Sequence, residues 1–308
     1  MRIRTPQPPS VPGALAAPAT GAAAPWRDQF IQQLSQMPMA LCAVSTLHPS
    51  TRAAASSTYT PRVRNCVCRG LWASLPENTR NSAPRNPAIY ETDLPVFTTD
   101  VRMEKAEEIT TSGGSVEAVW WASEAGTQWR VRGRAWLLGP EIETSAGKEA
   151  RTAIQKHMRR IPGSGSGSVG GSTAGSTGSA EWSWAREVTA HFGNLSPGMR
   201  GTFRNPTPGQ PRPARGTAGN TEPGEGLGKP VDNDQLYEPA ARANFRVCVI
   251  VPEEVDQVDL SDGKDPRRWL YTYIGEGEGE GEDGQDRAAR AQEAGEILNG
   301  WTKTELWP

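Results

Sequence analysis

Two arginines lie on a predicted β-strand that ends on glycine. Residues 64–70 read Arg-Asn-Cys-Val-Cys-Arg-Gly, so Arg64 opens the run and Arg69 stands next to its end. An arginine side chain is a planar fork whose N–H groups can hold two oxygens of one phosphate group. The chemistry that this strand end suits is therefore the binding of a phosphate ester.

A second basic cluster follows another predicted strand. Thr99 stands near the end of the strand expected at 94–100, and Arg102 and Lys105 follow at the expected start of a helix. A helix N-terminus adds oriented backbone N–H groups, which also attract anions. We expect the two strand ends to share one bound phosphate. On spacing alone, solvated charges on exposed strand faces explain the same residues.

A predicted hairpin presents a third basic face. Residues 115–123 and 127–138 are expected to form two strands joined by a short turn that contains glycine. Apolar residues alternate in the second strand with the arginines Arg130, Arg132 and Arg134, so one face is buried and the other is charged. This charged face is typical of a ligand wall and equally of a solvated sheet surface.

Strands dominate the elements that must position these side chains. Further strands are predicted at 39–47, 61–72, 94–100, 244–251, 255–260, 268–274 and 301–307, and helices at 25–37, 102–111, 145–161 and 180–195. Regular strand–helix alternation is missing, which argues against a doubly wound α/β fold. The pattern predicts a mainly antiparallel β core, arranged as a small barrel with helices over its ends.

Several stretches are too rich in glycine, proline or charge to pack. Residues 1–24 predict a disordered tail. Three flexible insertions are expected at about 162–180, 209–235 and 275–292, within a single domain that spans 25–308. The 33 glycines, 26 prolines and 36% hydrophobic content of the chain fit this division, because they leave a smaller share of the length for a core.

The overall charge and the cysteines limit the classes of partner and compartment. A net charge of -2 gives no reason to expect binding to nucleic acid or to an anionic membrane. No apolar run approaches the roughly 20 residues that span a bilayer. The four cysteines, Cys42, Cys66, Cys68 and Cys248, lie in apolar runs and predict buried free thiols in a reducing compartment. We expect a cytoplasmic protein, and the acid-free N-terminal tail leaves an organelle-targeting role open.

The ordered set of these segments resembles the pyridoxamine-phosphate-oxidase-like, FMN-binding split-barrel family. Residues 64–70 resemble its Arg-x-x-x-x-(Lys/Arg)-Gly strand, and residues 97–105 resemble its Phe-x-Thr-(Asn/Asp)-…-Lys turn. The remaining likenesses are those of residues 116–121 and 128–134 to its central hairpin and of residues 267–271 and 301–308 to its C-terminal strands. The resemblance implies a mainly β fold with flanking helices, an FMN-binding split β-barrel.

The resemblance also implies FMN as the cofactor and a homodimer, because in this family the flavin lies between two subunits. The implied cofactor-binding residues are Arg64, Arg69, Thr99, Arg102, Lys105, Gln128 and Arg268. The basic residues and the threonine of the two strand ends would hold the phosphate. Gln128 would contact the flavin or its ribityl chain, and Arg268 would reach the cofactor from another segment. No catalytic residue and no metal ligand is predicted.

Glu104 departs from the family pattern at the phosphate site, because better-known members have a second basic residue there. Two further departures bear on the substrate: Pro266 falls near a histidine that the true oxidase uses to hold its substrate, and a helix and the glycine–serine insertion replace the stretch that grips the phosphate of that substrate. We therefore expect an FMN-binding oxidoreductase with a different, unidentified small-molecule substrate. The alternative is a non-catalytic FMN carrier or sensor. A third reading, a stacking surface for single-stranded nucleic acid, conflicts with the net charge of -2.

Overall fold

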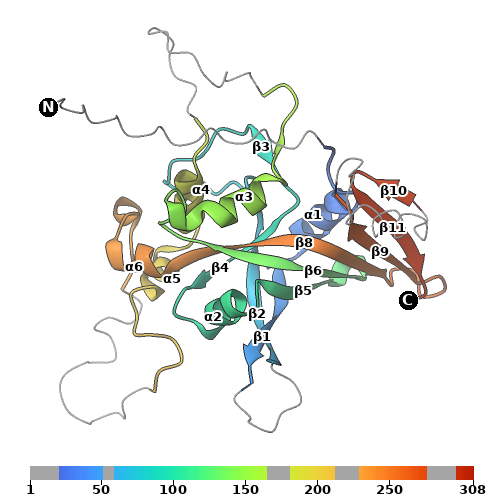
Figure 1. Cartoon of the computed structure of the whole chain (residues 1–308), viewed down its shortest axis with the longest axis horizontal. Helices are drawn as coiled ribbons and strands as arrows, with labels where there is room; N and C mark the ends of the chain where they lie inside the picture. The colour runs from blue at the N-terminus through green and yellow to red at the C-terminus, as the bar shows by residue number, and fades with distance from the viewer. Residues whose placement is uncertain (1–20, 51–58, 165–180, 212–228, 276–295) are drawn as a thin grey trace, which may run out of the picture.

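A computed structural model describes residues 21–50, 59–164, 181–211, 229–275 and 296–308 (Figure 1). Within these residues the fold is mainly β with flanking helices, as the sequence predicts. Most of the predicted tail at 1–24 and of the three predicted insertions lies outside the described residues. The single-domain division therefore stays a prediction.

Strand β8 closes the main sheet into a barrel. It spans Phe245–Asp259 and pairs with β4 (Pro95–Asp100) on one side and with β6 (Thr127–Leu138) on the other. The antiparallel strands between these two are β2 (Tyr59–Leu71), β1 (Leu41–Pro49) and β5 (Ser115–Ala122). Closure leaves each of these strands with a neighbour on both sides, which removes the free edges of an open sheet. This arrangement confirms the expected barrel.

The far half of β8 carries a short sheet outside the barrel. It pairs with β9 (Arg267–Tyr273), which is followed by β11 (Trp301–Leu306) and β10 (Glu296–Leu298). Figure 1 shows these three strands in red at one end of the molecule. The C-terminal strands expected from the sequence are therefore part of the same extended sheet.

One strand replaces the two that were predicted around Pro252. The register between β6 and β8 shifts beside Pro252: Arg132 faces Glu254 and Gly133 faces Pro252, so Glu253 is an extra residue in β8, and the strand continues through this irregularity. The backbones approach so closely that a Cβ on Gly133 would lie 2.0 Å from the carbonyl oxygen of Val251. The acidic residues that follow Pro252 belong to the strand and form no turn between two strands.

A helix near the N-terminus fills one side of the barrel core. In α1 (Arg27–Gln36) the ring of Phe30 packs edge-on against Trp120 and Trp129, at centroid distances of 5.1 and 5.5 Å. Such edge-to-face pairs add about 0.5–1.5 kcal/mol to the burial of the rings themselves. The four cysteines are buried and free, as predicted, and all four belong to this core.

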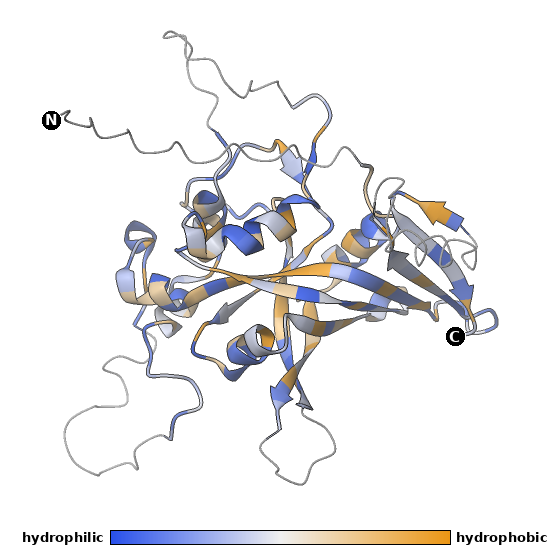
Figure 2. Ribbon diagram, viewed as in Figure 1, coloured by the Kyte–Doolittle hydropathy of each residue, from blue (hydrophilic) through white to orange (hydrophobic). Residues whose placement is uncertain are grey.

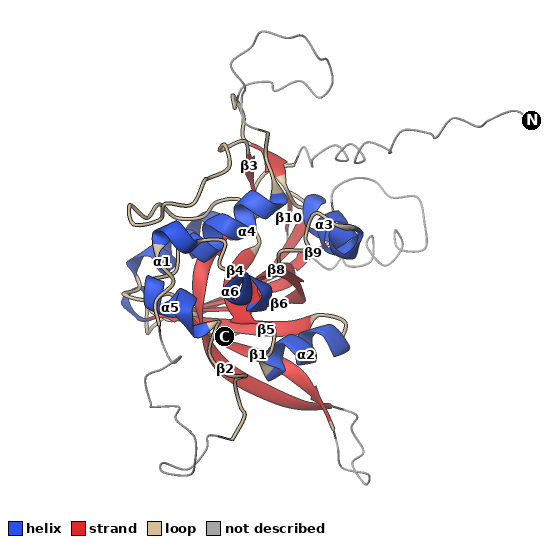
Figure 3. Ribbon diagram, turned by 90° about the vertical axis from the view of Figure 1, so that its left-hand side faces the viewer, coloured by secondary structure: helices blue, strands red, loops and turns tan. Residues whose placement is uncertain are grey.

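The other helices cover the outside of the strands (Figure 3). They are α2 (Glu104–Thr111), α3 (Lys148–Gln155), α4 (Trp184–Gly193), α5 (Pro197–Thr202) and α6 (Pro239–Asn244). A second core of tryptophans and aliphatic residues lies between α3, α4 and the strands. Figure 2 shows the hydrophobic stretch along the middle of β8 that contributes to both cores. No helix in the described part of the chain is long and apolar enough to cross a membrane.

The helix predicted at 145–161 is shorter than expected. After α3 the chain extends at Arg159–Arg160, which form β7 and pair with β3 (Tyr90–Glu91). The guanidinium of Arg159 makes a two-fold hydrogen bond with the carboxylate of Asp93, at 2.5 and 2.7 Å, and this pair is buried. A buried charge requires its partner, so the ion pair outweighs the local helical preference.

Candidate functional site

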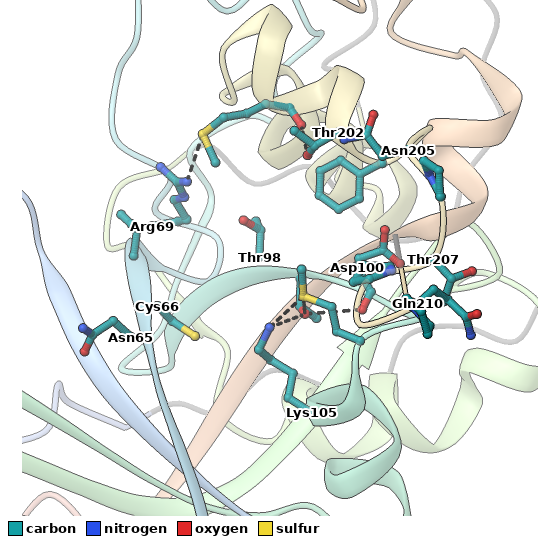
Figure 4. Close-up of a pocket in the computed structure, with 18 residues that line it drawn as sticks. Asn65, Cys66, Arg69, Thr98, Asp100, Lys105, Thr202, Asn205, Thr207 and Gln210 are labelled. Atoms are coloured by element: carbon teal, nitrogen blue, oxygen red, sulfur yellow. Dashed lines mark hydrogen bonds between the residues drawn. The ribbon is translucent and has the colours of Figure 1, made fainter. Parts of the chain in front are cut away.

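A cavity of about 560 Å³ lies between the ends of β2 and β4, the start of α2 and the chain that follows α5. Figure 4 shows its side chains converging from these separate elements. Its polar side chains are Asn65, Arg69, Thr98, Thr99, Asp100, Lys105, Thr202, Asn205, Thr207 and Gln210. Cys66, Val67, Met103, Met199, Phe203 and the prolines Pro206, Pro208 and Pro211 form the apolar part of the wall.

Arg69 reaches the cavity from the end of β2. The strand is irregular between Cys68 and Leu71, and Gly70 takes a φ of +94°, a conformation that suits glycine. The guanidinium contacts the sulfur of Met199 at 3.9 Å, and its Nε–H is buried without a hydrogen-bond partner among the described residues. Burial lowers the pKa of Arg69. It forms no ion pair with a described acidic residue, so it is a desolvated cation that favours an anionic ligand.

Lys105 faces the same cavity from the first turn of α2. Its Nζ donates to Thr99 Oγ1 at 3.2 Å and contacts the sulfur of Met103 at 2.9 Å. Burial lowers the pKa of Lys105 as well, and no described carboxylate forms an ion pair with it. Two partly buried cations and two threonine hydroxyls therefore meet in one cavity, as the sequence predicts for Arg69, Thr99 and Lys105.

Arg102 lies behind the cavity wall, in contrast to the expectation that it contacts a phosphate. Its Nε and Nη2 donate to the two carboxylate oxygens of Asp100 at 2.9 and 2.7 Å. Its Nη1 donates to the backbone carbonyl of Asn205 at 2.8 Å, and Nη2 also contacts that of Phe203 at 3.2 Å. The hydrogen bond with Asp100 raises the pKa of Arg102. Its guanidinium is thus occupied by the protein itself.

Arg64 is directed to α2 and does not line the cavity. Its Nη2 donates to Glu108 Oε2 at 2.7 Å, and the same carboxylate accepts hydrogen bonds from Thr46 and, at 3.1 Å, from Nδ1 of His48. Burial opposes the ionisation of Glu108, but the hydrogen bonds from Thr46 and Arg64 outweigh it and lower the pKa of the carboxyl. Only tertiary packing reveals this partner, because Glu108 follows Arg64 by 44 residues.

Gln128 and Arg268 also lie away from the cavity within one protomer. Gln128 is on β6, opposite Trp121 in β5 and Val258 in β8. Arg268 is on β9, where its Nη2 donates to Asp256 Oδ2 at 2.7 Å. The structure thus brings Arg69, Thr99 and Lys105 together and places the other predicted cofactor residues elsewhere in the protomer.

The arginine face of the hairpin is matched by acidic residues on β8. Arg130 pairs with Asp256, Arg132 pairs with Glu254 at 2.7 Å and Arg134 pairs with Glu253 at 3.3 Å. Burial disfavours the charged form of Asp256, but hydrogen bonds from Arg268 and Arg130 lower the pKa of its carboxyl. Of the two readings that the sequence left open, a neutralised sheet surface describes these residues better than a ligand wall.

The segment from Phe203 to Pro211, hereafter the 203–211 segment, forms another wall of the cavity. The sequence of residues 203–209 favours a structural turn and leaves open a turn beside a ligand; in the structure Phe203, Asn205 and the Pro206–Pro208 turn line the cavity. The signal that was present is the Pro-Thr-Pro sequence, which fixes backbone angles and holds a turn in a defined shape. What lay beyond the sequence was the position of that turn against β2 and β4.

Comparison with known proteins identifies the domain that contains Arg69, Thr99 and Lys105. Residues 23–139 match the model of the pyridoxamine 5'-phosphate oxidase FMN-binding domain. This part of the chain is an FMN-binding domain of the pyridoxamine 5'-phosphate oxidase type. The resemblance seen in the sequence is therefore confirmed, and so is FMN as the cofactor of the domain. A search of curated proteins gives no significant match.

One solved structure shows a similar fold over nearly the whole chain. A pyridoxamine 5'-phosphate oxidase-related, FMN-binding protein from Nostoc punctiforme PCC 73102 is 19% identical, with a TM-score of 0.54, over 93% of this chain and 100% of that one. PhzG from Burkholderia lata 383, crystallised with tetrahydrophenazine-1-carboxylic acid, is 13% identical, with a TM-score of 0.37, over 94% and 99% of the two chains. The Nostoc structure extends the likeness in fold beyond residue 139 to the C-terminal strands.

The cavity residues fit the phosphorylated end of FMN. A phosphate monoester carries close to two negative charges at neutral pH, and Arg69 and Lys105 supply two positive charges that form no ion pair with a described acidic side chain; Asp100 acts on Lys105 only through its charge. The unpartnered Nε–H of Arg69 and the hydroxyl groups of Thr98 and Thr99 add donors suited to phosphate oxygens. The FMN-binding family pattern and the local chemistry therefore agree at this end of the barrel.

Proposed function

We propose that this flavoprotein is an FMN-dependent oxidoreductase in which Arg69, Thr99 and Lys105 hold the cofactor phosphate. The observation that carries the phosphate assignment is the pair of partly buried cations that share one cavity and lack an acidic partner among the described residues. When bound, FMN supplies hydride or electron transfer. The residues of this chain anchor its phosphate and surround it with a largely apolar wall, which limits the access of water.

The proposed substrate is a small molecule other than pyridoxamine phosphate. Pro266 stands near the position of a histidine that holds the substrate in the true oxidase, and the stretch that grips the phosphate of that substrate is replaced in this chain. The cavity also contains the carboxylate of Asp100, already paired with Arg102. These features support a substrate that brings no second phosphate to this site.

The proposed assembly is a homodimer that shares its flavin sites. Gln128 and Arg268 lie away from the cavity of their own protomer, so their predicted contacts with the flavin require a second copy. Trp121, the cross-strand neighbour of Gln128, is 48% exposed, and a partner subunit would cover it. A cytoplasmic location belongs to the same proposal, because buried free thiols suit a reducing compartment.

A substitution at Arg69 tests the phosphate assignment. A charged hydrogen bond contributes about 1.5–3 kcal/mol, so Arg69→Ala should weaken FMN binding by about 10- to 100-fold. Riboflavin, which lacks the phosphate, should bind the variant as well as it binds the parent. Quenching of flavin fluorescence on titration with protein measures both affinities. Substitution of the exposed Arg80 by alanine is the matched control. Equal FMN affinity in Arg69→Ala and the parent would show that Arg69 does not bind the phosphate.

The alternative function is an FMN carrier or sensor without turnover. It is favoured by the replacement of substrate-holding residues, which removes groups that a related oxidase needs. The two functions differ in one assay, the reduction of bound FMN by NADH or NADPH followed at the visible flavin absorbance. Bleaching of the flavin at a catalytic rate supports the oxidoreductase, and a stable yellow protein supports the carrier.

A further inference from the structure

The guanidinium of Arg102 joins two parts of the cavity that are about a hundred residues apart in sequence. One part is the turn between β4 and α2, which carries Asp100 and leads to Lys105. The other is the 203–211 segment, which Arg102 reaches through the carbonyl oxygens of Asn205 at 2.8 Å and Phe203 at 3.2 Å. These contacts, hereafter the Arg102 joint, are largely shielded from solvent, because the side chain of Arg102 is 22% exposed and that of Asp100 is 4% exposed.

A second set of hydrogen bonds strengthens the same joint. Asn244 Nδ2 donates to the carbonyl oxygen of Phe203 at 2.8 Å. The backbone N–H of Val101 donates in turn to the backbone carbonyl oxygen of Asn244, also at 2.8 Å. The backbone N–H of Arg102 also donates to Asp100 Oδ1 at 2.8 Å. Asp100 therefore fixes both the main chain and the side chain of Arg102. Charge-assisted, two-fold hydrogen bonds of this kind are directional and hold a single geometry.

We propose that Arg102 is a positioning residue that holds the 203–211 segment as a wall of the cavity and thereby sets the affinity for the whole flavin nucleotide. This inference rests on the proposed function, since the cavity is taken to receive FMN. It assigns Arg102 a role different from that of Arg69 and Lys105, which face the cavity as cations. The wall that Arg102 holds presents Phe203, Pro206 and Pro208, which are apolar groups suited to a planar ring or a carbon chain.

Riboflavin separates a positioning role from direct phosphate binding. A residue that binds the phosphate contributes to the affinity for FMN and nothing to that for riboflavin. A residue that holds an apolar wall contributes to both affinities, because both molecules carry the ring and the ribityl chain. The rate of hydrogen exchange in the backbone of the 203–211 segment gives a second measure that needs no flavin.

The experiment compares the parent with Arg102→Ala and with the control Arg204→Ala. Arg204 lies in the same segment but its guanidinium approaches only Glu238 among the described acidic residues, at 3.8 Å, and it does not line the cavity. In Arg102→Ala we expect the affinities for FMN and riboflavin both to fall by about tenfold or more, and exchange in the 203–211 segment to become faster. In Arg204→Ala both affinities should stay within about twofold of the parent.

Three results would overturn the inference. They are a loss of FMN affinity with riboflavin unchanged, unchanged exchange in the 203–211 segment, and equal effects in the two variants. If Arg102→Ala does not fold, Asp100→Asn weakens the same joint while keeping its shape, and the same criteria apply. If the parent binds no flavin, the proposed function fails, and the exchange measurement still decides whether Arg102 holds the segment.

Discussion

Arg64 and Arg69 lie five residues apart on β2, and their surroundings give them different roles. Arg64 neutralises Glu108, whose side chain is 1% exposed, whereas Arg69 faces the cavity with no acidic partner among the described residues. A charge that is already paired with a buried carboxylate offers little to a ligand. A cation held in a desolvated position without a partner is one of the features that mark a binding site.

Loss of Arg64 should therefore affect stability more than cofactor affinity. In Arg64→Ala the carboxylate of Glu108 stays buried without its cation, which we expect to lower the free energy of unfolding by about 3 kcal/mol. Urea denaturation followed by tryptophan fluorescence measures the loss. The double variant Arg64→Met with Glu108→Leu removes both charges and should recover most of the stability. A change below about 0.5 kcal/mol in the single variant would contradict the importance of the pair.

Helix α5 leads directly into the 203–211 segment, which forms a wall of the cavity. It begins at Pro197, with Ser196 as its N-cap through a hydrogen bond from the N–H of Met199. Gly201 packs so closely that a Cβ there would lie 2.1 Å from the carbonyl oxygen of Lys229, whereas a Cβ on Gly198 would have nothing within 4 Å. The two glycines therefore differ in packing although they belong to one short helix.

Alanine substitutions at these two glycines form a matched pair. Gly201→Ala should lower the free energy of unfolding by about 1–3 kcal/mol, because the backbone carbonyl of Lys229 must move to make room for the added methyl group. Gly198→Ala should raise it by up to about 1 kcal/mol, because alanine loses less conformational freedom in a helix than glycine does. Thermal unfolding followed by circular dichroism checks the signs. A stabilised Gly201→Ala variant would show that α5 can move away from Lys229 without cost.

At the scale of the whole molecule, the buried His191 and the partly buried His157 make folding sensitive to acid. Burial lowers the pKa of His157 to about 4 and that of His191 to about 3. His191 is stacked on Trp72 at an interplanar angle of 2°, and Arg69 and Arg85 lower its pKa further. Both imidazoles are therefore neutral in the folded protein at a pH where the unfolded chain already binds protons.

The stability of the protein should accordingly fall as the pH drops below the ordinary histidine pKa of about 6.5. Each of the two histidines costs up to about 1.4 kcal/mol per pH unit between that value and its lowered pKa, because only the unfolded state takes up the proton. Urea denaturation at pH 7, 6 and 5 measures this slope. The His191→Phe variant should show a smaller slope than the parent, and the comparison cancels the contribution of Glu187, whose pKa burial raises. An equal slope in both proteins would contradict a neutral, buried His191.

The alternation of apolar and polar residues was enough to predict most strands, the barrel class and the burial of the cysteines. The order of strand ends was also enough to predict that Arg69, Thr99 and Lys105 lie close together, and the structure places them around one cavity. These features depend on local periodicity and on residues close to each other in sequence, so a single sequence contains them. The family pattern added FMN, which composition and spacing alone could not distinguish from other phosphate esters.

Tertiary structure alone decided which cations remain available for a ligand. Arg64 matches the family pattern as well as Arg69 does, and Arg102 was predicted to contact the same phosphate. However, Glu108 binds Arg64, and Asp100 with the carbonyl oxygens of the 203–211 segment binds Arg102. The partner of a charge depends on which distant elements pack beside it, and no local pattern records that choice. The position of the 203–211 segment against β2 and β4 has the same origin, since the long-range packing of α5 and α6 determines where that turn lies.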